Sequence, residues 1–197
     1  MNSPAQSPSV SLQTATRRGL VGNVSRAVLG HLVRCLLRVS VTCPPEVQAR
    51  LRDGGVLVTS NHVSLADGPL IALSSPVPLV FAVDTDYSRR SRVAMKGMAF
   101  LARIGCGAVV PLDSNAPFGI RALISALRAG GNVMVFPEGE IAATGALPPR
   151  LGLAWLERRA RPARVEVAIT GAERSRLFAK RGTEWLPRIH LDYRVND

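Results

Sequence analysis

The sequence predicts an α/β fold: a single domain with a largely parallel, mixed β-sheet flanked by helices and preceded by an N-terminal amphipathic helix. Three observations predict it. Short apolar runs typical of buried strands alternate with longer segments of helical periodicity, turn-forming glycine and proline residues separate them, and no convincing linker divides the chain. With 197 residues, 47% of them hydrophobic, the chain is long enough for one sizeable core.

The N-terminal residues contain little that predicts folded structure. Residues 1–16 are polar, rich in serine and proline, and lack the continuous apolar core that a signal peptide needs. They predict a disordered leader, followed by one domain over residues 17–197.

The first predicted element is a helix over residues 20–40. Its apolar side chains recur at steps of three and four residues, and its basic side chains occupy the remaining arc. The apolar set is Val21, Val24, Val28, Leu32, Cys35, Leu36 and Val39. Two interpretations are open: the helix covers the core as an ordinary surface helix, or it lies on anionic lipid with its apolar side in the interface.

The remaining elements follow from turn signals and apolar runs. Asp53, Gly54 and Gly55 predict a turn before a buried strand over 56–60, and a helix over 68–75 follows with Pro69 in its first turn. Further strands are predicted at 79–83, 107–112, 132–136 and 164–170, and helices at 91–104, 118–129 and 151–159.

The charge of the chain predicts an anionic partner. The formal net charge is +11, and all of the 25 basic residues except Lys96 and Lys180 are arginine. Lipid surface, an acidic carrier protein and nucleic acid would all fit, but an aromatic content of 5% and the lack of a known nucleic-acid-binding signature argue against nucleic acid. No apolar run is long enough to cross a membrane, and three cysteines without a secretory signal favour the cytoplasm.

Two motifs at predicted strand ends contain candidate catalytic side chains. In "LVTSNHVSLADG" (57–68), His62 and Asp67 follow a strand, and they could form a catalytic pair if the segment between them is a loop. The alternative is a loop histidine followed by Asp67 as an ordinary helix N-cap, with Asn61 and Ser64 as ordinary loop residues. In "VMVFPEGEIAATG" (133–145), Glu138 lies in a tight turn after another strand. Because parallel strands end at the same edge of a sheet, both motifs are expected to form one site.

The ordered motifs resemble those of the glycerolipid acyltransferases, which include the 1-acylglycerol-3-phosphate acyltransferases. "NHVSLAD" (61–67), "GAVVPLD" (107–113), "FPEG" (136–139) and "VEVAITGAE" (165–173) stand in the order of the four family motifs. "NHVS", "VPLD", "PEGEIAATG" and "ITGAE" resemble in particular the acyltransferase part of the bacterial 2-acylglycerophosphoethanolamine acyltransferases. The resemblance extends from about residue 28 to residue 195.

The resemblance implies transfer of a fatty acyl group from acyl-CoA or acyl-acyl-carrier protein to a lysophospholipid hydroxyl. It implies that His62 is the general base and that Asp67 orients it, without a covalent acyl-enzyme. It also implies that Asn61, Pro137, Glu138 and Gly139 bind substrate, that no metal or cofactor besides the acyl donor is needed, and that the protein works in the cytoplasm against the anionic inner face of the cell membrane.

The chain departs from the family pattern where a phosphate monoester would bind. Members acting on such acceptors typically have an arginine at the end of the second motif and another after the Glu-Gly of the third, but this chain has Ser114 and Glu140 there. Lysophosphatidic acid is therefore a poor candidate, and a phosphodiester lysophospholipid is preferred. Two other hypotheses stay open: an inactive lipid- or carrier-binding module, and a lipid esterase, although no Gly-x-Ser-x-Gly motif is present.

Overall fold

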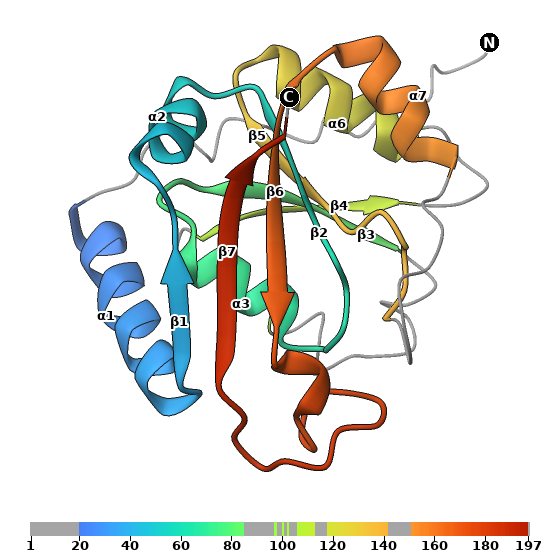
Figure 1. Cartoon of the computed structure of the whole chain (residues 1–197). Helices are drawn as coiled ribbons and strands as arrows, with labels where there is room; N and C mark the ends of the chain where they lie inside the picture. The colour runs from blue at the N-terminus through green and yellow to red at the C-terminus, as the bar shows by residue number, and fades with distance from the viewer. Residues whose placement is uncertain are drawn as a thin grey trace, which may run out of the picture.

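The computed structural model describes residues 20–84, 97, 100, 102, 106–112, 118–141 and 151–196. One sheet of seven strands runs through the molecule in the order β1-β7-β6-β2-β5-β3-β4 (Figure 1). Every neighbouring pair is parallel except β6 and β7, which are antiparallel. The predicted α/β fold with a largely parallel, mixed sheet is confirmed. The predicted leader over residues 1–16 lies outside the described residues.

The elements alternate along the chain as the sequence predicts. The strands are β1 (Val39–Thr42), β2 (Val56–Ser60), β3 (Leu79–Asp84), β4 (Gly107–Leu112), β5 (Asn132–Val135), β6 (Ala163–Thr170) and β7 (Ile189–Val195). The described helices are α1 (Leu20–Leu36), α2 (Pro45–Asp53), α3 (Asp67–Ser74), α6 (Phe118–Arg128), α7 (Leu151–Ala160) and the 3-10 helix η2 (Ala172–Arg174). Of the predicted helix over 91–104, the described residues 97, 100 and 102 are helical and the rest lies outside the described residues.

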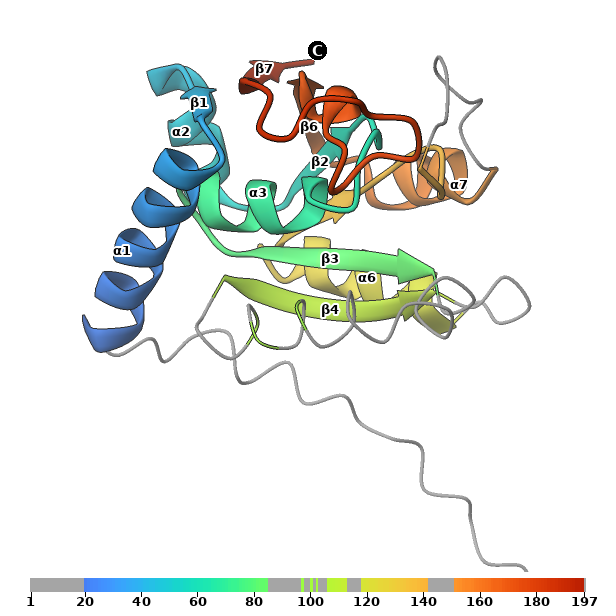
Figure 2. The same ribbon diagram turned by 90° about the horizontal axis from the view of Figure 1, so that it is seen from below.

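Helices cover both faces of the sheet. Alternate residues of a strand point to opposite faces, so Val56 and Val58 of β2 join one hydrophobic cluster and Leu57 joins the other. The first cluster packs under α1, α2 and α3, and the second packs under α6 and α7. Figure 2 shows α1 beside α3, with which it makes direct contacts. This arrangement leaves the carboxyl ends of β2, β5 and β6 together at one edge.

Three elements differ from the sequence prediction. The predicted helix over 20–40 ends at Leu36, Arg38 takes a left-handed conformation with φ 54°, and Val39 begins an edge strand. Prolines 44 and 45 do not merely break the pattern, because Pro45 occupies the first turn of α2, where its missing amide is not needed. Strand β7 was not predicted, although its residues alternate between buried and more exposed positions as a half-buried strand requires.

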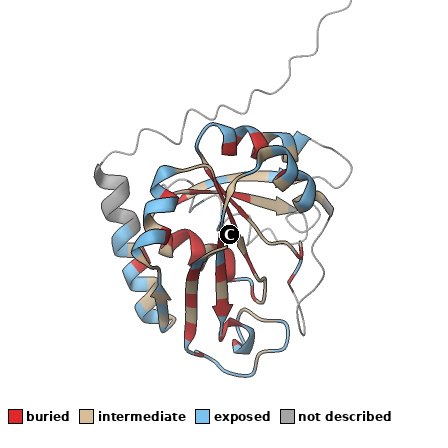
Figure 3. Ribbon diagram, turned by 45° about the horizontal axis from the view of Figure 1, so that its top comes forward, coloured by how far each residue is buried: buried red, intermediate tan, exposed pale blue. Residues whose placement is uncertain are grey.

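The buried side of α1 is not the one that the apolar pattern predicts. Leu29 and Val33 of α1, and Leu37 directly after it, pack against the core. Three residues of the predicted apolar stripe are exposed instead: Val28 is 54%, Leu32 58% and Leu36 70% accessible. Figure 3 shows this outer side of α1 in the colour of exposed residues. The helix therefore has apolar residues on two sides: one side contacts the core and the other faces outward.

Candidate active site

Asn61 determines how the chain leaves the sheet at the end of β2. Its side-chain amide donates to the Ile169 carbonyl at 2.8 Å, and its amide oxygen accepts from the Ile169 backbone N–H at 2.8 Å. These two side-chain hydrogen bonds take the place of the next backbone hydrogen bonds between β2 and β6, so the main chain is free to turn outward. Both hydrogen-bonding atoms of Asn61 are occupied, and its predicted contact with substrate stays a prediction.

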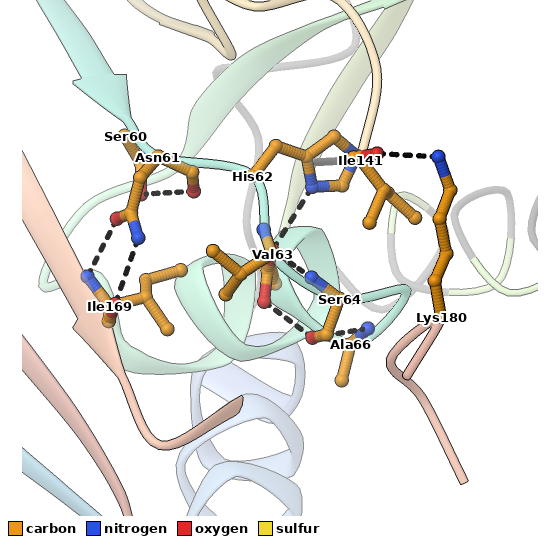
Figure 4. Close-up of polar contacts among 10 residues, drawn as sticks. Ser60, Asn61, His62, Val63, Ser64, Ala66, Ile141, Ile169 and Lys180 are labelled. Carbon is orange, nitrogen blue, oxygen red and sulfur yellow. Dashed lines mark hydrogen bonds and ion pairs between the residues drawn. The ribbon is translucent and has the colours of Figure 1, made fainter. Parts of the chain in front are cut away.

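His62 and Asp67 contact each other across the loop that follows. The His62 Nδ1 lies 3.0 Å from the Asp67 Oδ2, a contact that Figure 4 marks with a dashed line from His62. The Asp67 side chain is fully buried, whereas 15% of the His62 side chain is exposed. A carboxylate can only accept, so geometry assigns the proton to Nδ1 and leaves Nε2 as an acceptor. The segment between them is not helical, which is the condition that the pair requires.

The Asp67 carboxylate is fixed by four donors. Besides His62, its Oδ2 accepts from the backbone N–H groups of Val63 and Ser64, each at 2.7 Å, and its Oδ1 accepts from the Ser64 hydroxyl at 2.5 Å. Helix α3 begins at Asp67 itself, after Ala66 and without a side-chain cap. The alternative of Asp67 as an N-cap is wrong, because its carboxylate faces back toward residues 62–64.

The third motif contributes a ring that supports the imidazole. Phe136 follows β5, which pairs with β2 in parallel, so both strands end at the same edge. Its ring stacks on the His62 ring with the centroids 4.1 Å apart and the planes 18° apart. This contact joins the first and third motifs into one site, as the sequence predicts. The stacking itself could not be predicted, because no spacing rule relates residues 74 positions apart.

The Pro137-Glu138-Gly139 turn, which follows Phe136 in the third motif, contains a buried carboxylate. Gly139 has φ 72° and its N–H donates to the Phe136 carbonyl at 3.0 Å, a tight turn in which a glycine avoids backbone strain. Glu138 is only 9% exposed, and its Oε2 has no hydrogen-bond partner among the described residues. Buried carboxylate oxygens are nearly always bonded, so this one is suited to a ligand donor.

Comparison with known protein families identifies the family of this chain. Residues 38–170 match the acyltransferase family. The chain belongs to that family. The matched region includes His62, Asp67 and the turn that contains Glu138, and it ends at the last residue of β6.

The acyltransferase fold is also seen in a solved relative. The crystal structure of the 1-acyl-sn-glycerophosphate (LPA) acyltransferase, PlsC, from Thermotoga maritima superposes with a TM-score of 0.59 at 19% sequence identity. The match covers 87% of this chain and 67% of that one. Across the part of this acyltransferase that the structure describes, no helix is long and apolar enough to span a bilayer.

Proposed function

We propose that this acyltransferase moves a fatty acyl group from acyl-CoA or acyl-acyl-carrier protein to the free hydroxyl of a lysophospholipid. The ester forms between the acceptor oxygen and the acyl carbon, and the thiol of CoA or of the carrier is released. One observation supports this most strongly: the His62 imidazole is oriented by a buried carboxylate on one side and by the Phe136 ring of the third motif on its face.

His62 acts as the general base in the proposed reaction. With Nδ1–H held by Asp67, Nε2 accepts the proton of the acceptor hydroxyl as its oxygen attacks the thioester carbonyl. The imidazolium, stabilised by Asp67, then returns the proton to the departing thiolate. The thioester is already activated, so no acyl-enzyme intermediate is needed.

Glu138 positions the acceptor in this proposal. Its Oε2, which has no partner among the residues that the structure describes, can accept a hydrogen bond from a glycerol hydroxyl or from an amine in the headgroup. The exposed Glu140 follows two residues later and would repel a phosphate dianion. The preferred acceptor is therefore a lysophospholipid with a phosphodiester headgroup, such as lysophosphatidylethanolamine.

The test uses radiolabelled acyl-CoA and acyl-acyl-carrier protein with lysophosphatidylethanolamine and lysophosphatidic acid as acceptors. Labelled diacyl phospholipid is expected, and His62→Ala should lower its rate by roughly 10²- to 10⁴-fold. His190→Ala is the matched control, because the His190 Nδ1 likewise forms a side-chain hydrogen bond, to the Ser40 hydroxyl at 2.8 Å, but on strands away from the site. Labelled free fatty acid without acceptor would identify an esterase instead, and a fully active His62→Ala would remove the proposed base.

We further propose that the protein works at the inner face of the cell membrane. The exposed Leu32 and Leu36 of α1 provide an apolar surface, and the positively charged chain suits anionic lipid. The end of α1 adjoins a second exposed apolar segment, because the Arg38 guanidinium donates to the Leu186 carbonyl at 3.5 Å and Trp185 beside it is also exposed. Tryptophan is favoured at the level of lipid headgroups.

Sedimentation with vesicles of phosphatidylglycerol or phosphatidylcholine tests this surface. Binding should prefer phosphatidylglycerol, weaken with salt, and be lost when Leu32 and Leu36 are both changed to Asp. Phe118→Asp is the control, because Phe118 is an exposed apolar residue on α6, across the sheet from α1. Equal binding by the unchanged protein, the Leu32 and Leu36 double variant and Phe118→Asp would contradict the proposal.

A further inference from the structure

The segment between η2 and β7 is a closed loop rather than a loose connection. The Arg176 N–H donates to the Glu184 carbonyl at 2.7 Å, and the Glu184 N–H donates to the Arg174 carbonyl at 2.9 Å. Inside this closure, a side chain at Gly182 would collide with the Ser175 carbonyl. The loop therefore has a defined shape and can hold a side chain at a fixed place.

This loop contacts both segments that form the candidate active site. The Leu65 N–H, between His62 and Asp67, donates to the Phe178 carbonyl at 2.8 Å. The Lys180 ammonium donates to the Ile141 carbonyl at 2.6 Å, three residues after Glu138. Figure 4 shows the Lys180 side chain extending to Ile141 from a segment other than the one that carries His62. A cation is thus held beside the turn of the third motif.

Lys180 is an exposed residue, and no described residue neutralises its charge. Among the described residues, Lys180 forms no ion pair, and the Ile141 carbonyl accepts one of its three N–H groups. An ammonium is a compact charge with several donors, which suits a single phosphate oxygen rather than a bidentate contact. The neighbouring Glu140 is exposed, and its carboxylate has no N–H or O–H group to donate to a phosphate oxygen.

We infer that Lys180 binds the phosphodiester of the acceptor and thereby selects a phosphate-bearing lysolipid. The inference rests on the proposed function and deepens it, because it names the residue that recognises the headgroup. One ammonium matches the single charge of a phosphodiester, while Glu138 is left for the hydroxyl or amine of the same molecule. Lys180 is a specificity-determining residue here and takes no part in proton transfer.

The test compares Lys180→Gln, Lys180→Arg and the neighbouring control Arg181→Gln. With lysophosphatidylethanolamine, Lys180→Gln should raise the acceptor KM about tenfold, about 1.4 kcal/mol of binding, while kcat stays close to that of the unchanged protein. Lys180→Arg should recover much of this loss. Turnover of monoacylglycerol, which has the hydroxyl without the phosphate, should not change.

Other outcomes overturn the inference. An equal loss with both acceptors, together with a lower unfolding midpoint, would make Lys180 a structural contact of the loop. A rise in the acyl-CoA KM alone would place the donor phosphate at Lys180. Binding of hexadecylphosphocholine, measured by calorimetry without turnover, separates the two proposals: weaker binding to Lys180→Gln supports the phosphate contact even if no acyl transfer is found, and unchanged binding refutes it.

Discussion

Changing Asp67 to Asn tests whether the buried carboxylate serves the chemistry or only the fold. Asparagine has the same shape and can be accommodated with its oxygen at the place of Oδ2, accepting from His62, Val63 and Ser64, and with its amide directed to the Ser64 hydroxyl. The Ser64 hydroxyl oxygen already accepts one hydrogen bond, from the Ala66 N–H at 3.2 Å, and its second lone pair can accept from the amide. Three of the four hydrogen bonds therefore survive and the fourth reverses, which leaves the Ser64 hydroxyl proton without that acceptor, and the negative charge is lost.

The expected cost to folding follows from the four bonds that the carboxylate accepts. Bonds to a charged group contribute roughly 1.5–3 kcal/mol and neutral ones about 1 kcal/mol. The buried carboxylate, however, also carries a desolvation cost that asparagine avoids. We expect the free energy of unfolding to fall by about 2–4 kcal/mol, less than the roughly 5–15 kcal/mol that stabilises most domains.

The expected cost to catalysis is larger. Without the charge, the imidazolium formed during attack is no longer stabilised, so kcat should fall by roughly 10²- to 10⁴-fold with the acceptor KM changed less than about threefold. Acyl transfer and urea unfolding are measured together, with Asp192→Asn as the control, because Asp192 pairs with Arg194 on the exposed side of β7. A folded Asp67→Asn protein with kcat near that of the unchanged enzyme would refute the pair.

Three further substitutions test how the site and core are built. Asn61→Ala removes the two hydrogen bonds from the Asn61 side chain to the Ile169 backbone of β6, so the unfolding free energy measured in urea should fall by about 1–3 kcal/mol. An unchanged urea midpoint would show that these bonds do not stabilise the fold. Gly171 and Gly130 both have positive φ angles, 87° and 81°, but an added Cβ would collide with the Arg188 carbonyl only at Gly171. Gly171→Ala should therefore lower the free energy of unfolding more than Gly130→Ala does, and equal decreases would contradict the collision. Tyr193 is buried without a partner for its hydroxyl among the described residues, so Tyr193→Phe should be as stable or more stable at neutral pH. Burial raises the pKa of Tyr193, so above about pH 10 the tyrosine ionises in the unfolded chain but not in the folded one. The free energy of unfolding should then decline by up to about 1.4 kcal/mol per pH unit, and the Phe variant should lack this decline.

Much of the fold could be predicted because its signals are local. Short apolar runs predicted β2 through β6, and the loop from His62 to Ala66 followed from the requirement that the pair should meet. The same local rules failed at Pro44 and Pro45, where two prolines can either end one segment or begin the next. They also failed for β7, whose polar residues resemble a loop until β6 and β1 flank it.

The sequence by itself determined the alternation of strands and helices, the place of His62 and Glu138 at strand ends, and the presence of the N-terminal helix α1, since each depends on residues close together in the chain. Only the tertiary structure decided which side of α1 faces the core, that Asp67 faces His62, that Phe136 stacks on the imidazole, and that Lys180 reaches Ile141. The reason is that periodicity relates a residue only to neighbours within a few positions. Contacts between distant segments depend on strand order, because that order decides which loops meet at the same edge of the sheet.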